Sequence, residues 1–221
     1  MTEPRRTFGD LLTAVAAAAD GGVDWVQLRD KSASAGALYA QARALDDVLA
    51  RHDTRLAVND RLDVALAVGA AGVHLAGQSL PVAAAMRLAD QRLLVGRSVH
   101  DLEEARAAAD DGADYLTFGH VFPTASHDGV PPRGLAQLAE IVEAVDTPVL
   151  AIGGITVRNL DQTLATGCAG IAVISAILAD ANPRTAAARL REALDASPHT
   201  PRRPFSGVLR RRGTHRQPAN V

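Results

Sequence analysis

Residues 102–119 read LEEARAAADDGADYLTFG and contain one complete change from helical to strand character. Residues 102–111 carry apolar side chains at helical spacing, Gly112 follows where a helix would end, and DYLTF is typical of a buried strand. Similar changes occur at GGVDWV, GAAGVHL and GCAGIAV. Helices that alternate with strands in this way predict βαβ crossovers and a parallel sheet.

Working outward from this unit, residues 7–20, 34–50 and 81–90 also have the period and length of helices. Strand-like segments lie between the helical ones: VDWVQLR, RLAVN, GVHL, LLVG, PVLAIGG and GIAVIS, in addition to DYLTF. About seven strands result, whereas a closed (β/α)₈ barrel has eight. We predict an α/β fold, a (β/α)₈ TIM barrel whose first strand is missing or degenerate. An open flavodoxin-like sheet is the structural alternative.

The shortfall lies at the N-terminus, where MTEPRRTFGDLL runs almost directly into the first helix. Either the first strand is absent from this sequence, or MTEPRRT forms a degenerate first strand. Residues 1–196 are predicted to form the barrel domain. Residues 197–221 are rich in Pro and Arg and lack periodicity, which predicts a disordered tail that includes an arginine run at 210–212.

Composition excludes several classes of protein. The chain has 221 residues, 48% of them hydrophobic, and a net charge of -2, so no basic stripe indicates nucleic acid as a partner. The one cysteine, Cys168, cannot form a disulfide within the chain and stands in an apolar run typical of a buried thiol. We find no signal-peptide core or membrane segment and expect a cytoplasmic protein.

The segment after DYLTF carries the candidate for catalysis. Functional residues of parallel barrels gather where strands end, and here Gly119-His120 ends a strand. A histidine with an ordinary pKa near 6.5 takes up and releases a proton at neutral pH. The following turn, with Thr124 and Ser126, offers hydroxyls that suit a phosphate. The structural alternative for His120 is a strand-end histidine hydrogen-bonded to backbone.

The other strand ends supply polar groups as well. Arg29 and Lys31 flank Asp30 and suit phosphate or pyrophosphate capture, although cations at such positions are often only solvated. Asp60 is equally a Mg²⁺ ligand or, like Asn59, a helix cap. The remaining expected contacts to ligand are Gln27 and Ser98, and a phosphate cradle is expected at Gly153, Gly154, Ile174 and Ser175. Ser79 is interpreted as a helix N-cap and His74 as an inner-wall histidine.

Together these segments resemble the thiamine phosphate synthase and thiazole tautomerase superfamily over roughly residues 24–179. The blocks VQLRDK, VNDRLD, GVHL, GRSVH, GADYLTFG, FPT, AIGGI and AVISAI occur in family order. The resemblance implies a (β/α)₈ barrel. Family synthases join a pyrimidine diphosphate to a thiazole phosphate and release pyrophosphate with Mg²⁺. Family tautomerases aromatise a carboxythiazole ethyl phosphate without a metal.

The branch is predicted from the departures. Asp60 matches the first metal aspartate of the synthases, but Ser79 stands where the second would fall, and His127 replaces an expected lysine. GRSVH and FGHVF resemble the tautomerases, in which the histidine of FGHVF is the proposed acid and base, matching His120. We therefore predict a tautomerase with His120 as proton shuttle, a small phosphorylated thiazole as substrate and no cofactor. In this reading, Thr124, Ser126, Arg29 and Lys31 would line the carboxylate side.

Two alternatives stay open at this point. The first is a synthase that uses Mg²⁺ at Asp60, because VNDR and RDK are closer to the corresponding motifs of the synthases. The second is a non-catalytic protein that binds thiazole or thiamine phosphates and regulates a partner. An unclosed barrel would also expose strand edges, so a homo-oligomer is possible.

Overall fold

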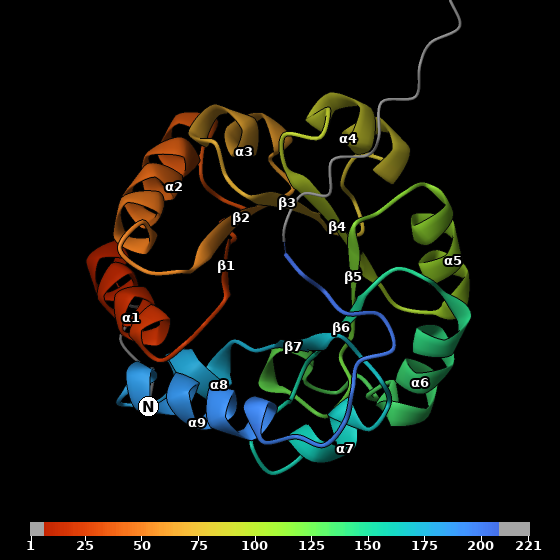
Figure 1. Ribbon diagram of the computed structural model, residues 1–221. Helices are drawn as coiled ribbons and strands as arrows, with labels where there is room; N and C mark the ends of the chain where they lie inside the picture. The colour runs from red at the N-terminus through yellow and green to blue at the C-terminus, as the bar shows by residue number, and fades with distance from the viewer. Residues whose placement is uncertain (1–6, 208–221) are drawn as a thin grey trace, which may run out of the picture.

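The computed structural model describes residues 7–207, and in this range seven parallel strands pair in sequence order. They are β1 (Trp25–Leu28), β2 (Arg55–Asn59), β3 (Gly72–Leu75), β4 (Leu94–Val99), β5 (Tyr115–Gly119), β6 (Val149–Ile152) and β7 (Gly170–Ala172). The sheet curls into an incomplete ring with helices on its outside (Figure 1). The predicted parallel α/β fold is confirmed. The flavodoxin-like alternative is wrong, because the strands of a flavodoxin-like sheet do not lie in sequence order, whereas these strands do.

The outer layer consists of the segments predicted to be helical and the crossovers between the later strands. Its members are α1 (Phe8–Asp20), α2 (Ala35–Leu49), α3 (Leu62–Val68), α4 (Val82–Ala89), α5 (Leu102–Asp110), α6 (Gly134–Ala144), α7 (Leu160–Leu164), α8 (Ser175–Leu178) and α9 (Pro183–Asp195), with a 3₁₀ turn, η1 (Ala125–His127). Thr7 and Asp10 form a capping box at the start of α1, and the Asp101 carboxylate accepts from the Glu104 N–H at the start of α5. These caps satisfy backbone donors that no helix residue can reach.

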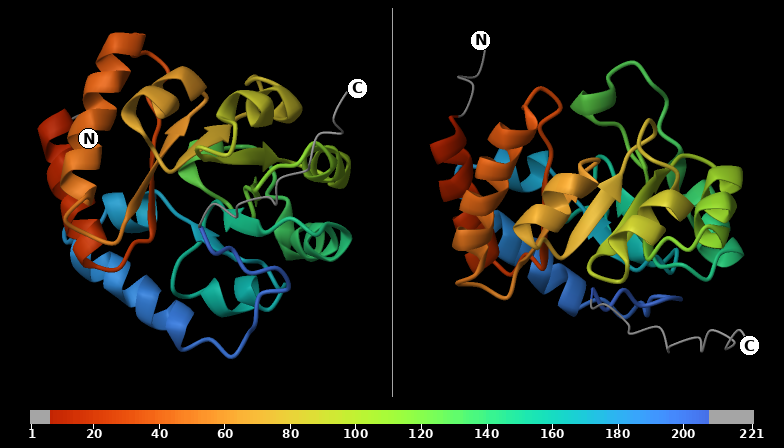
Figure 2. Two further views of the ribbon diagram at one scale, coloured as in Figure 1. Left: turned by 45° about the horizontal axis from the view of Figure 1, so that its top comes forward. Right: turned by 90° about the horizontal axis from the view of Figure 1, so that it is seen from above.

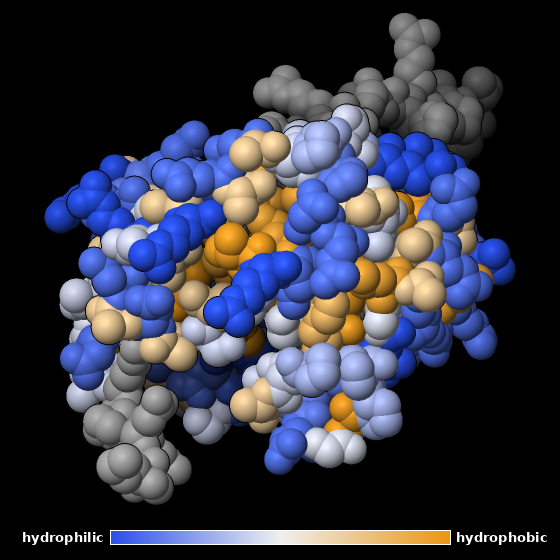
Figure 3. All heavy atoms as spheres, turned by 90° about the horizontal axis from the view of Figure 1, so that it is seen from below, coloured by the Kyte–Doolittle hydropathy of each residue, from blue (hydrophilic) through white to orange (hydrophobic). Residues whose placement is uncertain are grey.

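The ring of helices closes although the sheet does not. Among residues 7–207, β1 and β7 pair with one neighbour each and not with one another, so an eight-stranded barrel is not seen there. Residues 1–6, considered above for the first strand, lie outside the described residues. Helix α1 packs against α9 so closely that a Cβ on Gly21 would lie 2.5 Å from the Arg184 carbonyl oxygen. On the side of α8 and α9, hydrophobic surface shows between hydrophilic side chains (Figure 3).

Inward-facing glycines make room for two aromatic rings inside the barrel. A Cβ on Gly72 would lie 3.2 Å from the Trp25 ring, and a Cβ on Gly96 would lie 2.1 Å from the Tyr115 ring. Successive strand residues face opposite sides, so Tyr115 and Thr117 point inward while Phe118 is fully buried beneath the helices. The interior therefore alternates small and large residues, as narrow barrels require.

The C-terminal stretch described by the structure lies against the barrel. It crosses the ring at the end opposite to the rising loop that contains η1 (Figure 2). Arg202 donates its backbone N–H to the Gly167 carbonyl at 2.9 Å, and Phe205 contacts Trp25 and Tyr115. The rest of the predicted tail, including the arginine run at 210–212, lies outside the described residues. None of the helices within residues 7–207 combines the length and apolarity that crossing a bilayer demands.

Candidate functional site

The predicted site residues lie at one end of the barrel, because each stands near or after the carboxyl end of a parallel strand. Some of them line two hollows. The first, of about 380 Å³, lies beyond β1, β2 and β3 and is lined by Asp30, Lys31, Ala33, Asn59, Asp60, Arg61, Ala76, Gly77 and Gln78. The second, of about 320 Å³, lies in the loop after β5 and is lined by Pro123, Thr124, Ala125, His127, Asp128, Gly129 and Val130.

Asp60 is held in the first hollow by three side-chain and backbone donors. Its carboxylate accepts from the Ala76 N–H at 2.9 Å, from the Asn59 amide at 2.7 Å and from the Ser79 hydroxyl. Burial would raise the pKa of Asp60, but these hydrogen bonds and the charge of Lys31 hold that pKa below its usual value. The group is therefore a carboxylate at neutral pH.

The backbone of Asp60 has a φ of 61°, in the left-handed region that non-glycine residues seldom adopt. This strain turns the chain sharply between β2 and α3. The alternative role of Asn59 or Asp60 as a helix cap is wrong, because Arg61 is the N-cap of α3 and no side chain caps it. Strained backbone that carries a carboxylate into a hollow is typical of functional sites.

Ser79 does not act as the predicted N-cap. The N-cap of α4 is Pro81, without a side-chain hydrogen bond, and the Ser79 hydroxyl donates to Asp60 instead. The structure therefore places Ser79 beside the Asp60 carboxylate. By the resemblance described above, the synthases would have their second metal aspartate at the position of Ser79. Asn59 also reaches β1, because it accepts from the Gln27 amide at 2.9 Å. Arg29 does not line this hollow, whereas Lys31 does.

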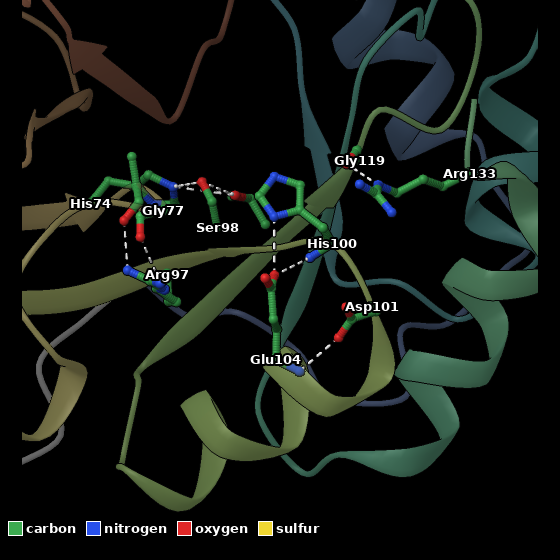
Figure 4. A network of polar contacts seen from close by, with 11 residues as sticks. His74, Gly77, Arg97, Ser98, His100, Asp101, Glu104, Gly119 and Arg133 are labelled. Atoms are coloured by element: carbon green, nitrogen blue, oxygen red, sulfur yellow. Dashed lines mark hydrogen bonds and ion pairs between the residues drawn. The ribbon is translucent and has the colours of Figure 1, made fainter. Parts of the chain in front are cut away.

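The next polar cluster, missed in part by the sequence analysis, lies inside the barrel (Figure 4). His74 is 3% exposed, and its Nε2 lies 2.8 Å from the Ser98 hydroxyl and 3.2 Å from that of Thr117. Its Nδ1 lies 3.2 Å from the Tyr115 hydroxyl. The inner-wall interpretation of His74 is confirmed. Tyr115 and Thr117 were missed, although the alternation of polar and apolar residues in YLTFG could have identified them.

The ionisation of this cluster follows from its burial. Burial lowers the pKa of His74 from 6.5 to about 4, with Asp60 opposing that shift and Arg97 adding to it. Burial likewise raises the pKa of the Tyr115 hydroxyl, and Asp114 raises it further. His74 is therefore neutral at pH 7 and has one nitrogen that donates and one that accepts.

Arg97 and His100 hold neighbouring segments rather than pointing freely at a ligand. Arg97 donates to the Ala76 carbonyl at 2.6 Å and so fixes the turn that lines the first hollow (Figure 4). The ring of His100 lies 3.0 Å from the Glu104 carboxylate at the start of α5. Within the described chain, no group of three or more His, Cys, Asp or Glu side chains is arranged to hold a metal.

His120 is 6% exposed and is engaged with its own loop. Its Nε2 lies 3.2 Å from the Val130 carbonyl oxygen, and its ring stacks on that of His127 at 4.6 Å between centroids. This is the arrangement of the structural alternative, in which the imidazole donates to backbone. Of the predicted neighbours, Thr124 and His127 line the second hollow, whereas Ser126 does not.

The glycines predicted to cradle a phosphate are packed against this loop. A Cβ on Gly153 would lie 2.3 Å from the His120 Cβ, and a Cβ on Gly154 would lie 2.5 Å from the Pro123 carbonyl oxygen. The close approach that glycine permits is used here by the chain itself. Ile174, 61% exposed, and Ser175 stand at the start of α8, and their contact with a phosphate stays a prediction.

Comparisons with known proteins identify the family of the chain. A family model described as "Thiamine monophosphate synthase" matches residues 1–177. The chain is 45% identical over 192 residues to a "Thiamine-phosphate synthase" of Albidiferax ferrireducens, covering 86% of each, and 46% identical over 182 residues to a "Putative thiamine-phosphate synthase" of Geobacter sulfurreducens, covering 82% and 85%. A solved thiamine phosphate pyrophosphorylase from Pyrococcus furiosus superposes with a TM-score of 0.77 at 41% identity, covering 83% of this chain and 89% of that one.

These findings overturn the predicted thiazole tautomerase. Relatives at 42–46% identity that cover most of the chain carry the name thiamine-phosphate synthase, printed as putative for one of them. The prediction of an isomerase closer to the tautomerase branch is therefore wrong. It relied on His120, whose imidazole the structure shows bonded to backbone.

Proposed function

The chain belongs to the thiamine monophosphate synthase family, and we propose that it joins a pyrimidine diphosphate to a thiazole phosphate. The ring nitrogen of the thiazole forms a bond to the carbon that carries the diphosphate. The bond from that carbon to oxygen breaks, and pyrophosphate leaves with the electron pair. The lone pair of a neutral thiazole nitrogen attacks without a base, so His120 needs no proton-transfer role in this reaction.

The observation that carries the proposal is the first hollow, where an anionic Asp60, Lys31 and Asn59 meet beyond three adjacent strands. Lys31 is exposed and supplies a cation for the charge that grows on the leaving pyrophosphate. Arg29, two residues earlier and also exposed, lies outside the lining of this hollow, so its contact with the pyrophosphate stays a prediction. Ser98 lies in β4 with its hydroxyl 2.8 Å from His74 Nε2 inside the barrel, and its contact with a substrate stays a prediction.

The donor set fits a Mg²⁺ that arrives with its diphosphate. Mg²⁺ is usually bound by one or two carboxylates together with substrate phosphates and water. Asp60 provides one carboxylate, and Ser79 offers a neutral oxygen beside it. When bound, the ion would neutralise charge on the departing pyrophosphate. Asp60 and Ser79 would hold it, and we expect weak Mg²⁺ binding without diphosphate because the second carboxylate is replaced.

Pyrophosphate release by the purified chain, followed as Mg²⁺ is titrated, tests this function. Replacing Asp60 with Asn should raise the half-saturating Mg²⁺ concentration by roughly 10- to 100-fold, since contacts to charged groups are worth about 1.5–3 kcal/mol. Calorimetric binding of Mg²⁺ with inorganic pyrophosphate should weaken in parallel. Asp47→Asn is the matched control, because Asp47 pairs with Arg43 on the surface of α2 and lines neither hollow.

Two outcomes would contradict the proposal. Absence of pyrophosphate release from the wild-type chain at every Mg²⁺ concentration would reject the synthase. Equal effects of the two substitutions would reject Asp60 as the metal-holding residue. The cytoplasmic location and the possible homo-oligomer stay predictions, for which cell fractionation and sizing are the tests.

A further inference from the structure

The C-terminal strap, defined here as residues 198–207, seats an aromatic side chain in the N-terminal mouth of the barrel. The Phe205 ring centroid lies 5.8 Å from that of Trp25 and 5.0 Å from that of Tyr115, with both pairs tilted. The Arg55 guanidinium donates to the Gly207 carbonyl and lies 5.9 Å from the Trp25 ring. Trp25, Arg55 and Tyr115 are the first residues of β1, β2 and β5, so the strap spans the mouth.

Two ion pairs of the strap lie on the surface. Arg203 pairs with Asp146 and Arg202 with Glu143, and the carboxylate side chains are 88% and 70% exposed. Exposed ion pairs contribute little to stability, whereas aromatic contacts in a partly buried setting contribute more. Phe205 is therefore the side chain that anchors the strap.

A continuous set of contacts leads from this anchor to the candidate site. Phe205 packs against the Tyr115 ring, and the Tyr115 hydroxyl lies 3.2 Å from His74 Nδ1. The other nitrogen of His74 lies 2.8 Å from the Ser98 hydroxyl. The Tyr115 ring also packs directly on Gly96, where an added Cβ would lie 2.1 Å from a ring carbon. Ser98 is half-buried and stands where β4 approaches the ligand end of the barrel.

We propose that the strap positions the active site: Phe205 fixes the Tyr115 ring, Tyr115 fixes the orientation and tautomer of His74, and His74 directs the Ser98 hydroxyl. The strap lies beyond residues 1–177, which the family model matches. Phe205, Tyr115 and His74 act through Ser98 and are positioning residues. The effect of the strap on kcat rests on the proposed function, whereas its effect on the position of His74 does not.

The test uses Phe205→Ala in the full chain, with three measurements. Trp25 is the one tryptophan of the sequence, so its fluorescence emission reports directly on the strap and should shift to longer wavelength. The ring ¹⁵N resonances of His74 should move, and kcat for pyrophosphate release should fall roughly 10-fold with an intact circular dichroism spectrum, since small displacements of positioned groups cost rate. Phe205→Leu should keep the His74 resonances and kcat close to their wild-type values.

Two further variants separate positioning from general loosening. Tyr115→Phe keeps the ring and removes its hydroxyl, so the His74 resonances and kcat should change while Trp25 emission does not. Arg203→Ala removes an ion pair of the same strap on the surface and should leave all three measurements unchanged.

Each adverse result points to a specific error. Unchanged Trp25 emission in Phe205→Ala would show that the strap is not seated as described. Shifted emission with unchanged His74 resonances would reject the coupling to the site. If the wild-type chain releases no pyrophosphate, the proposed function fails, and the His74 resonances still decide the coupling. Should Phe205→Ala not fold, Phe205→Leu and Tyr115→Phe decide it.

Discussion

His74 makes the free energy of unfolding depend on pH between about 4 and 6.5. Burial, with a smaller contribution from Arg97 and opposition from Asp60, lowers the pKa of this histidine from 6.5 to about 4 in the folded chain. In the unfolded chain the pKa returns to near 6.5, so the unfolded state binds the extra proton first. Stability is therefore fully present above pH 6.5 and is lost as the pH falls toward 4.

The magnitude follows from the two pKa values. At about 1.36 kcal/mol for each pKa unit, the full loss of unfolding free energy is about 3 kcal/mol, and about 2 kcal/mol of it has gone by pH 5. Urea unfolding followed by Trp25 fluorescence at pH 7.5, 6 and 5 measures this loss. The same series on His74→Gln supplies the reference, because the other six histidines and all carboxylates titrate in both proteins.

The expected result is that His74→Gln loses about 2 kcal/mol less than the wild-type chain between pH 7.5 and 5. The variant starts from a lower stability, since its partners Tyr115, Ser98 and Thr117 lose hydrogen bonds at every pH. Only the slope against pH bears on the argument. Parallel curves for the two proteins would refute it and would mean that His74 is solvated or already charged in the folded chain.

Two further predictions concern packing. Gly96→Ala should lower the free energy of unfolding by about 1–3 kcal/mol, because its Cβ would meet three Tyr115 ring atoms within 2.4 Å. Gly36→Ala, in open space on α2, is the control and should be neutral or stabilising, and thermal unfolding compares the two variants. Cys168 is 2% exposed and burial raises its pKa, so a thiol reagent should react with it far more slowly in the native than in the denatured chain; rapid native labelling would place Cys168 at the surface.

Much of the fold could be predicted from the sequence because local and global signals agree. Residues 102–111 have helical period, an aspartate before them that caps and a glycine after them, and α5 occupies Leu102–Asp110. The strap could not be predicted in this way. A Pro- and Arg-rich segment has no period, and the seating of Phe205 depends on a partner, Trp25, at the other end of the chain. Pairings of that kind leave no local pattern.

In the candidate site, too, some residues could be placed from the sequence and others could not. Asp60, Lys31 and Asn59 could be placed together from their positions after adjacent parallel strands, and the first hollow contains all three. The hydrogen-bond partner of His120 could not, because it is the backbone carbonyl of Val130, and a carbonyl has no sequence signature.

Strands β1 and β7, which do not pair with one another within residues 7–207, give the barrel a seam, and the seam has a consequence for ligand binding. Amide protons in these two strands are protected by one neighbour each, so they should exchange with solvent sooner than those of β3 to β5. Lys31 follows the strand on one side of the seam, and Ser175 follows the strand on the other. The two proposed substrates, one with a diphosphate and one with a phosphate, would then bind on opposite sides of the seam, and the bond formed between them would span the gap that residues 7–207 leave in the sheet.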